Sequence, residues 1–207
     1  MNPLTYANTQ MVLASGSPRR LELMRMMGFD PRVRVSSVDE IPDHGEDGTA
    51  YTRRLCREKA EAVRHSLNQD DPDWILAADT VVERDGQILE KPQSPEHAFE
   101  MLRELRGRPH TVTTSFCWLH RGGVICDVGT VTATVFFRDV EDAALRNYIR
   151  TGEPMDKAGA YGAQGIGAFL VERIEGSYHA IVGLPVGEVI ESLTALGGLD
   201  DFPFVEK

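Results

Sequence analysis

The alternation of apolar and polar positions along the chain predicts a mixture of strands and helices. Mostly apolar runs of the kind that forms buried strands occur at 11–14, 74–82, 111–119, 124–137 and 169–174. Apolar residues recur at helical spacing at 18–27, 51–65, 95–106, 142–149 and 186–196. Because strands and helices alternate in no regular βα order, the pattern favours an α/β fold with a mixed sheet.

Turn and capping residues indicate how these elements connect. Asp85-Gly86 between two apolar runs predicts a hairpin over 81–89, and the glycines before Val124 predict a second antiparallel pair. Ser17 and Ser94 each precede a proline, which is typical of a helix start. We therefore expect a twisted mixed sheet flanked by helices.

Length and composition limit the architecture and the class of ligand. The 207 residues are 42% hydrophobic, enough for one core or for two lobes around a central cleft, and we expect a single domain over 1–207. The net charge of −10 argues against a nucleic-acid partner, because affinity for a phosphate backbone comes from clustered Lys and Arg. A polyanionic ligand would need a local basic patch.

Cysteine usage and the N-terminal region bear on the compartment. Cys56, Cys117 and Cys126 show no paired metal-ligand spacing, so we expect reduced thiols rather than a zinc site or a disulfide framework. The early apolar run at 11–14 is far too short for a secretion signal or a membrane span. These features predict a cytoplasmic protein without a membrane partner.

A basic, serine-containing segment begins the first predicted helix. Arg19 and Arg20 lie in its first turn, where the helix dipole is already positive. That placement is explained if an anion binds there, with Ser15, Ser17 and the free helix amides as further donors. Two solvated arginines at the start of a surface helix are the alternative.

Acidic residues mark a second candidate feature. Asp79 lies within an otherwise apolar strand, where an unpaired carboxylate would be costly. Either a cation, a metal or a strong set of hydrogen bonds compensates its charge, or the strand ends there and Asp79 faces water at a turn. Glu40 is a candidate second acidic ligand. With no histidine or cysteine ligand in view, Mg²⁺ or Mn²⁺ suits such a set of oxygen atoms.

Two lysines and a glycine-rich segment complete the candidate chemistry. Lys59 lies on a charged helix and Lys91 follows the predicted hairpin, and each is also consistent with a simple surface position. The segment 151–167 is too rich in glycine for a simple turn and too long for one. Its Gln164 can donate and accept hydrogen bonds at the edge of a base. A packed loop tied by Asp156 and Lys157 is the alternative.

Taken together, these segments resemble the Maf family of nucleoside triphosphate pyrophosphatases. The resemblance runs from about Val12 to Pro185 and is carried by Leu13–Arg20, Arg57–Ala60, Ala77–Val82, Lys91-Pro92, Glu153–Gly165 and Gly176–Val186. It implies a Maf/ITPase-like fold and the hydrolysis of a nucleoside triphosphate to monophosphate and pyrophosphate with a divalent metal. It also implies a homodimer, since members of the family are commonly dimers.

The resemblance further implies roles for individual residues. Asp79 would be the proton acceptor and a metal ligand, with Glu40 as the neighbouring acidic ligand. The triphosphate site would be lined by Ser15, Arg19, Arg20, Lys59 and Lys91. Arg19, Thr80 and Gln164 occupy positions associated with substrate choice in the branch that acts on dTTP and UTP. Whether the substrate is a normal or a modified pyrimidine nucleotide stays open at this point.

Other functions remain open at this point. A non-catalytic, nucleotide-binding regulator of septum formation is one alternative, and a 7-methyl-GTP pyrophosphatase is a second. A phosphomonoesterase that releases inorganic phosphate is a third, because the same acidic and basic residues would serve it.

Overall fold

The sheet is the frame on which the other elements pack. In the computed structural model, which describes residues 11–199 and 202, seven strands form one mixed sheet with the order β2-β1-β3-β5-β6-β7, and β4 also pairs with β3. The strands are β1 (Met11–Leu13), β2 (Arg32–Val33), β3 (Trp74–Arg84), β4 (Gln87–Leu89), β5 (Pro109–His120), β6 (Val124–Phe137) and β7 (Val171–Glu175).

One edge of β3 is divided between two neighbours. β1 pairs with it in parallel over Trp74–Leu76, and β4 pairs with it antiparallel over Val82–Arg84. On its other edge β3 pairs with β5 without interruption over Trp74–Glu83. Within the described chain, the stretch 77–81 therefore has a strand on one edge only, and the sheet opens at this point.

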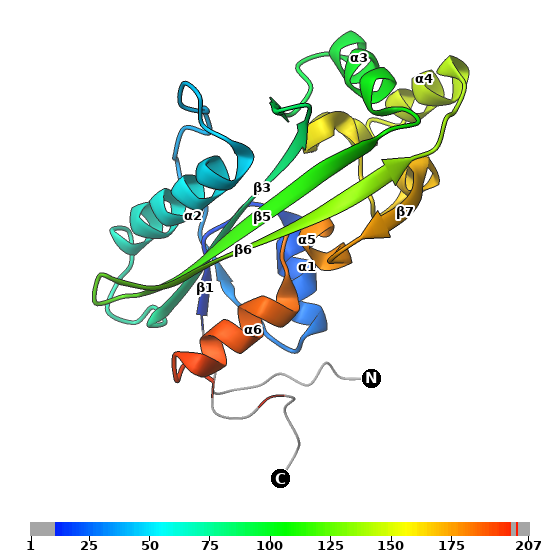
Figure 1. The fold of residues 1–207 in the computed structure, drawn as a ribbon. Coiled ribbons are helices and arrows are strands. Elements are labelled where there is room, and N and C mark those ends of the chain that lie inside the picture. The colour runs from blue at the N-terminus through cyan, green and yellow to red at the C-terminus, as the bar shows by residue number, and fades with distance from the viewer. Residues whose placement is uncertain (1–10, 200–201, 203–207) are drawn as a thin grey trace.

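Helices cover both faces of the sheet, as Figure 1 shows. The helices are α1 (Pro18–Met26), α2 (Gly48–Arg64), α3 (Pro95–Leu105), α4 (Asp142–Arg150), α5 (Tyr178–Val182) and α6 (Val186–Ala195). Helix α2 lies along one face, against β3 and β5. The opposite face carries α1, α5 and α6 at one end and α3 and α4 at the other.

That opposite face holds two separate apolar cores. Side chains of α1 and α6 pack on Leu76, Ala78 and neighbouring residues of β5, whereas α3, α4 and the glycine-rich segment pack around Val82 and Val112. Between the two cores, the same face of β3 and β5 carries the hydroxyls of Thr80 and Thr114, which are paired across the strands. The predicted mixed sheet with two lobes around a cleft is confirmed.

Most of the predicted elements are confirmed, with some differences. Asp85 and Gly86 have φ values of 51° and 77°, as a type I′ hairpin turn requires. The strand predicted at 169–174 is wrong at its start: β7 begins at Val171, because residues 169 and 170 belong to the 3₁₀ turn Ile166–Leu170. The short elements β2 and α5 were not predicted.

None of the helices in residues 11–199 combines the length and the apolar character needed to cross a membrane.

The buried His110 makes the stability of the fold depend on pH. Its Nε2 lies 2.8 Å from the Tyr161 hydroxyl, and its Nδ1 has no hydrogen-bond partner among the described residues. Burial, and then the charge of Arg84, lower the pKa of His110 from 6.5 to about 4. The unfolded chain therefore binds more protons between these values, so stability is expected to fall by about 3 kcal/mol as the pH drops through this window.

His110→Gln removes the titrating group and keeps a polar partner near Tyr161. We expect a flatter dependence of the unfolding free energy on pH between 6.5 and 4, measured by urea denaturation across that range. The exposed His97→Gln serves as the control, and its pH profile should match that of the wild type. An unchanged slope in His110→Gln would contradict the assignment.

Candidate functional site

A cavity of about 440 Å³ opens where the edge of β3 lacks a strand neighbour. It lies between the two cores on one face and reaches the α2 side through the open edge of the sheet. All nine candidate site residues line it: Ser15, Arg19, Arg20, Glu40, Lys59, Asp79, Thr80, Lys91 and Gln164. The structure thus gathers residues that are spread over 150 positions of the sequence around one space.

The alternation of β3 directs Asp79 and Thr80 to opposite faces of the sheet. Ala77 and Val81 pack toward α2, and Asp79 points the same way, whereas Thr80 points toward α1 and α5. Both side chains reach the cavity because no strand covers this part of the edge. Asp79 is buried, with its side chain 8% exposed.

A buried lysine compensates the charge of Asp79. Lys59 lies on α2 between Leu55 and Val63, on the face of the helix that packs against the sheet. Its Nζ atom is 2.5 Å from Asp79 Oδ1 and 2.6 Å from Glu40 Oε1. The Lys59 side chain is 6% exposed, so the surface position considered for it is wrong.

The two carboxylates differ in protonation behaviour. Burial raises the pKa of Asp79, and the nearby Lys59 and Arg20 offset only part of that effect. Burial acts in the same direction on Glu40, but its hydrogen bond to Lys59 and the charges of Lys59 and Lys91 bring the pKa of Glu40 below its usual value. A buried carboxylate with a raised pKa suits a proton acceptor.

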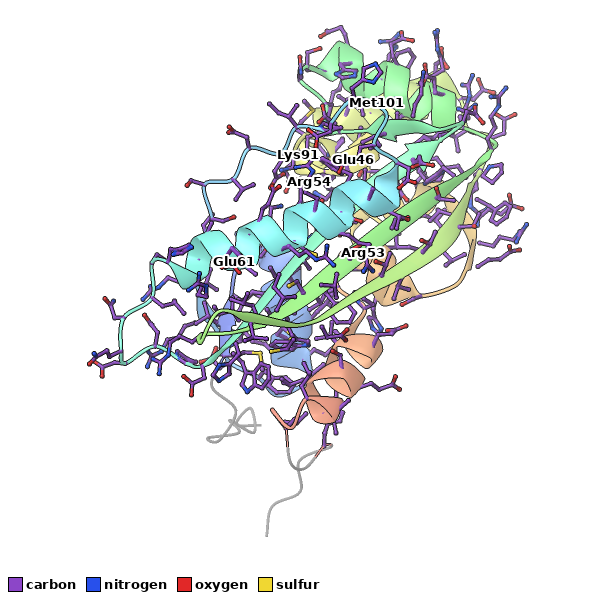
Figure 2. All side chains as sticks on the ribbon, turned by 60° about the vertical axis from the view of Figure 1, so that its left-hand side comes forward. Glu46, Arg53, Arg54, Glu61, Lys91 and Met101 are labelled. Atoms are coloured by element: carbon purple, nitrogen blue, oxygen red, sulfur yellow. The ribbon has the colours of Figure 1, made fainter. Side chains whose placement is uncertain are left out.

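Lys91 lies at the rim of the cavity, unlike Lys59. Its side chain is 61% exposed, and its Nζ is 3.7 Å from Glu40 Oε2. In the view of Figure 2, Lys91 lies beside the part of α2 that carries Arg54, near Glu46 and away from Glu61. In this position an extended ammonium can reach a ligand that enters the cavity.

Arg20 is already bound to groups of the protein. It donates from Nη1 to Ser15 Oγ at 3.0 Å and from Nη2 to Thr80 Oγ1 at 3.0 Å. Its Nε donates to the backbone carbonyl oxygen of Gly183 at 2.8 Å, which joins α1, β3 and the end of α5. Arg20 therefore organises the floor of the cavity, and its direct contact with an anion stays a prediction.

The start of α1 keeps donors available at the cavity. Ser17 occupies the N-cap position, as predicted, but its side chain makes no capping hydrogen bond. Its backbone amide instead donates to Ser15 Oγ at 3.2 Å. The first-turn amides and Arg19 thus face a cavity, an arrangement that favours an anion.

The glycine-rich segment closes the other side of the cavity and contributes residues that the sequence analysis did not single out as ligands. Lys157 lines the cavity and contacts Asp156 Oδ1 at 2.6 Å, which confirms the pair considered as a tie for this segment. Asp156 also lies 3.7 Å from Arg19, so the two sides of the cavity meet in an exposed ion pair. In the sequence, the signal for Lys157 was its place in the glycine-rich segment that carries part of the family resemblance, because no predicted phosphate ligand lies near it in the chain.

The lining of the cavity combines charged and apolar side chains. Five cationic side chains and three carboxylates line it: Arg19, Arg20, Lys59, Lys91, Lys157, Glu40, Asp79 and Asp156. Apolar side chains line it as well, among them Val82, Val112, Tyr161, Ala163, Ile181 and Val182, together with Gln164. The cations form the local basic patch that a polyanion requires in an acidic chain, and the apolar side chains suit a flat ring.

The donor set also fits a divalent cation held jointly with a ligand. Glu40 and Asp79 both contact the Lys59 ammonium, so their carboxylates lie side by side at the cavity. No group of three or more His, Cys, Asp or Glu side chains placed for a metal occurs in the part of the chain that is described. Two carboxylates completed by phosphate oxygens and water are a common Mg²⁺ environment.

Comparison with known proteins identifies the family. The Maf-like protein model matches residues 10–196. The dTTP/UTP pyrophosphatase of Desulfotalea psychrophila is 43% identical over 183 residues, covering 88% of this chain and 92% of the relative. The dTTP/UTP pyrophosphatase of Shigella sonnei is 44% identical over 191 residues, covering 92% and 95%.

A solved structure is also similar. The nucleoside-triphosphatase, or dITP/XTP pyrophosphatase, of Mycobacterium abscessus matches with a TM-score of 0.41 at 14% identity, over 92% of this chain and 97% of that one. The family assignment rests on the sequence matches, which extend over nearly the whole chain. The chain therefore belongs to the Maf-like protein family.

Proposed function

We propose that the protein is a nucleoside triphosphate pyrophosphatase that hydrolyses dTTP and UTP to the monophosphate and pyrophosphate. The observation that carries the proposal is a single cavity whose lining combines a cluster of cations around Asp79 with apolar side chains and Gln164. The cations suit the triphosphate, and the apolar side chains with Gln164 suit the base. The names of the relatives, which act on dTTP and UTP, support the same assignment.

In the proposed reaction, Asp79 orients a water molecule and accepts its proton as the water oxygen attacks the α-phosphorus. The bond from the α-phosphorus to the bridging oxygen breaks, and pyrophosphate leaves. Lys59 holds the carboxylate of Asp79 at 2.5 Å in the orientation needed for this step. Arg19, Lys91 and Lys157 stabilise the charge that builds up on the leaving group.

The proposal includes a divalent cation, Mg²⁺ or Mn²⁺, held by Glu40 and Asp79 together with the phosphates. When bound, it supplies positive charge that offsets the substrate and polarises the phosphorus under attack. We further propose that the protein works in the cytoplasm as a homodimer.

We assign the discrimination between uracil or thymine and cytosine to Gln164. Uracil and thymine present an acceptor, a donor and an acceptor along one edge, so a carboxamide can donate to a carbonyl and accept from N3–H. Cytosine reverses this pattern at two positions, so a carboxamide held in the orientation that fits uracil leaves polar groups without partners in the cytosine complex. Modified uracil bases that keep this edge would be accepted as well.

The test is turnover of a nucleotide panel (dTTP, UTP, CTP, ATP, GTP and 7-methyl-GTP) with magnesium present. We expect dTTP and UTP to be hydrolysed much faster than CTP, with pyrophosphate as the product. Gln164→Leu should lower kcat/KM for UTP by about tenfold, the value of roughly one hydrogen bond, and narrow its advantage over CTP. Preference for CTP or 7-methyl-GTP would contradict both the substrate and the role of Gln164.

Product analysis separates the remaining alternatives. Release of inorganic phosphate instead of pyrophosphate would indicate a phosphomonoesterase. Nucleotide binding without turnover of any member of the panel would favour the regulator of septum formation.

A further inference from the structure

One carboxylate outside the cavity holds the segment that carries Gln164. Glu153 begins the 3₁₀ turn Glu153–Asp156, directly after α4. Its Oε1 accepts hydrogen bonds from the Tyr148 hydroxyl and from the Gly167 amide, both at 2.9 Å, and its Oε2 accepts one from the Ile166 amide at 2.9 Å. Three donors from two parts of the chain thus converge on one side chain.

Tyr148 extends this connection to the other end of the segment. Its hydroxyl accepts a hydrogen bond from the Gly162 amide at 3.0 Å while it donates to Glu153. The stretch 162–167 is therefore fixed at both ends to the Glu153–Tyr148 pair, and Gln164 lies between the fixed points. Gln164 itself is exposed, so this connection determines where its backbone is placed.

The glycines of the segment fit closely around the carboxylate. A Cβ at Gly165, which has a φ of 103°, would come within 2.9 Å of Glu153 Oε2. A Cβ at Gly162 would come within 3.1 Å of Glu153 Oε1 and of the Gln164 carbonyl oxygen. The glycines thus allow the backbone to wrap around Glu153, which gives a reason for the composition of this segment.

Glu153 is ionised in this environment. Burial opposes ionisation, but the amides of Gly167 and Ile166 and the Tyr148 hydroxyl keep the pKa of Glu153 below its usual value. A carboxylate accepts at both oxygens, whereas a glutamine has one acceptor oxygen and an amino group that cannot accept. The network therefore depends on the acid and not only on the size of the side chain.

We propose that Glu153 is a positioning residue that fixes Gln164 at the cavity and thereby sets the choice among pyrimidine nucleotides. Gly162, Ala163 and Gln164 line the cavity and Glu153 is not among the lining residues, so its effect passes through the segment. This inference rests on the proposed function, because it assigns a cause to the preference for dTTP and UTP.

The test compares Glu153→Gln with Glu172→Gln, a matched control at an exposed glutamate on β7 outside the cavity. We measure kcat and KM for UTP and CTP and the unfolding midpoint of each variant. Glu153→Gln should lower the ratio of kcat/KM for UTP to that for CTP by about tenfold, mainly through KM for UTP, as expected for one misplaced hydrogen bond. Glu172→Gln should leave the ratio at the wild-type value.

The double variant Glu153→Gln/Gln164→Leu shows whether Glu153 acts through Gln164. If it does, Glu153→Gln changes the ratio no further once Gln164 is leucine. An equal loss of kcat for both nucleotides with an unchanged ratio is the result of a merely structural role and overturns the proposal. A further tenfold fall in the ratio when Glu153→Gln is added to Gln164→Leu also overturns the proposal.

Hydrogen exchange of the nucleotide-free protein provides a readout that is independent of turnover. The amides of Ile166 and Gly167 should exchange at least tenfold faster in Glu153→Gln and at the wild-type rate in Glu172→Gln. Unchanged exchange overturns the role of Glu153 as the anchor of the segment. A wild-type protein that does not prefer UTP to CTP instead refutes the proposed function, and with it the specificity role, whatever the exchange shows.

Discussion

Replacement of Asp79 by asparagine is expected to lower kcat/KM for dTTP and UTP by about 10²–10⁴-fold, the usual contribution of a general base, while the protein stays folded. Asparagine has nearly the same shape and keeps an oxygen that can accept the hydrogen bond from Lys59. It lacks the charge that takes up the proton of the attacking water and that holds a divalent cation. Steady-state kinetics measure the fall in kcat/KM, and an unfolding curve on the same preparation checks that the variant is folded.

Asp70→Asn is the matched control, since Asp70 is an exposed aspartate outside the cavity. It should retain wild-type kinetics. A folded Asp79→Asn protein with the wild-type rate would remove Asp79 from the reaction and require another proton acceptor.

The pH profile of the wild type tests the same residue without a substitution. Because the pKa of Asp79 is raised, its carboxylate takes up a proton at a higher pH than an ordinary aspartate does. The acid limb of kcat/KM should therefore lie above the usual range of an aspartate. Glu40→Gln removes a negative charge that contributes to this shift, so the limb should move to lower pH.

Local patterns were sufficient for most of the fold. The apolar run around Asp79 and the Asp85-Gly86 turn predicted β3 and its hairpin because strand composition and turn geometry are local properties. The start of β7 was misplaced by two residues because the apolar residues 169 and 170 match a strand pattern, although they end the 3₁₀ turn Ile166–Leu170. The division of the edge of β3 between β1 and β4 depends on non-local pairing, which periodicity does not encode.

The place of the proposed site residues was predictable, but their connections were not. Each of the nine residues proposed from single motifs and the family resemblance lines the cavity, among further lining residues such as Lys157 that were not proposed. The sequence did not reveal that Arg20 is bound by three protein groups or that Glu153 anchors the glycine-rich segment. For Lys59 a signal was present: it lies four residues from Leu55 and from Val63, so a charge occupies the apolar face of α2.

Removal of the buried charge of Lys59 is expected to have a large effect on stability. Lys59→Met is expected to lower the free energy of unfolding by about 3–5 kcal/mol at neutral pH, because removing one partner of a buried ion pair leaves the other without compensation. The cost comes mainly from Asp79, whose side chain is 8% exposed, and less from Glu40, which is 44% exposed. Urea denaturation measures this loss of stability. Lys91→Met is the control, because the Lys91 side chain is 61% exposed, and its free energy of unfolding is expected to lie within about 0.5 kcal/mol of the wild-type value.

The double variant Lys59→Met/Asp79→Asn separates charge from packing. If the uncompensated carboxylate is the cause, removing it restores most of the lost stability, which a double-mutant cycle measures directly. The single variant should also recover as the pH falls: without Lys59 the pKa of Asp79 in the folded state rises further above its unfolded value, so the folded state binds more protons. A double variant as unstable as Lys59→Met, with a deficit independent of pH, would show that Lys59 stabilises α2 through the packing of its aliphatic chain and not through its charge.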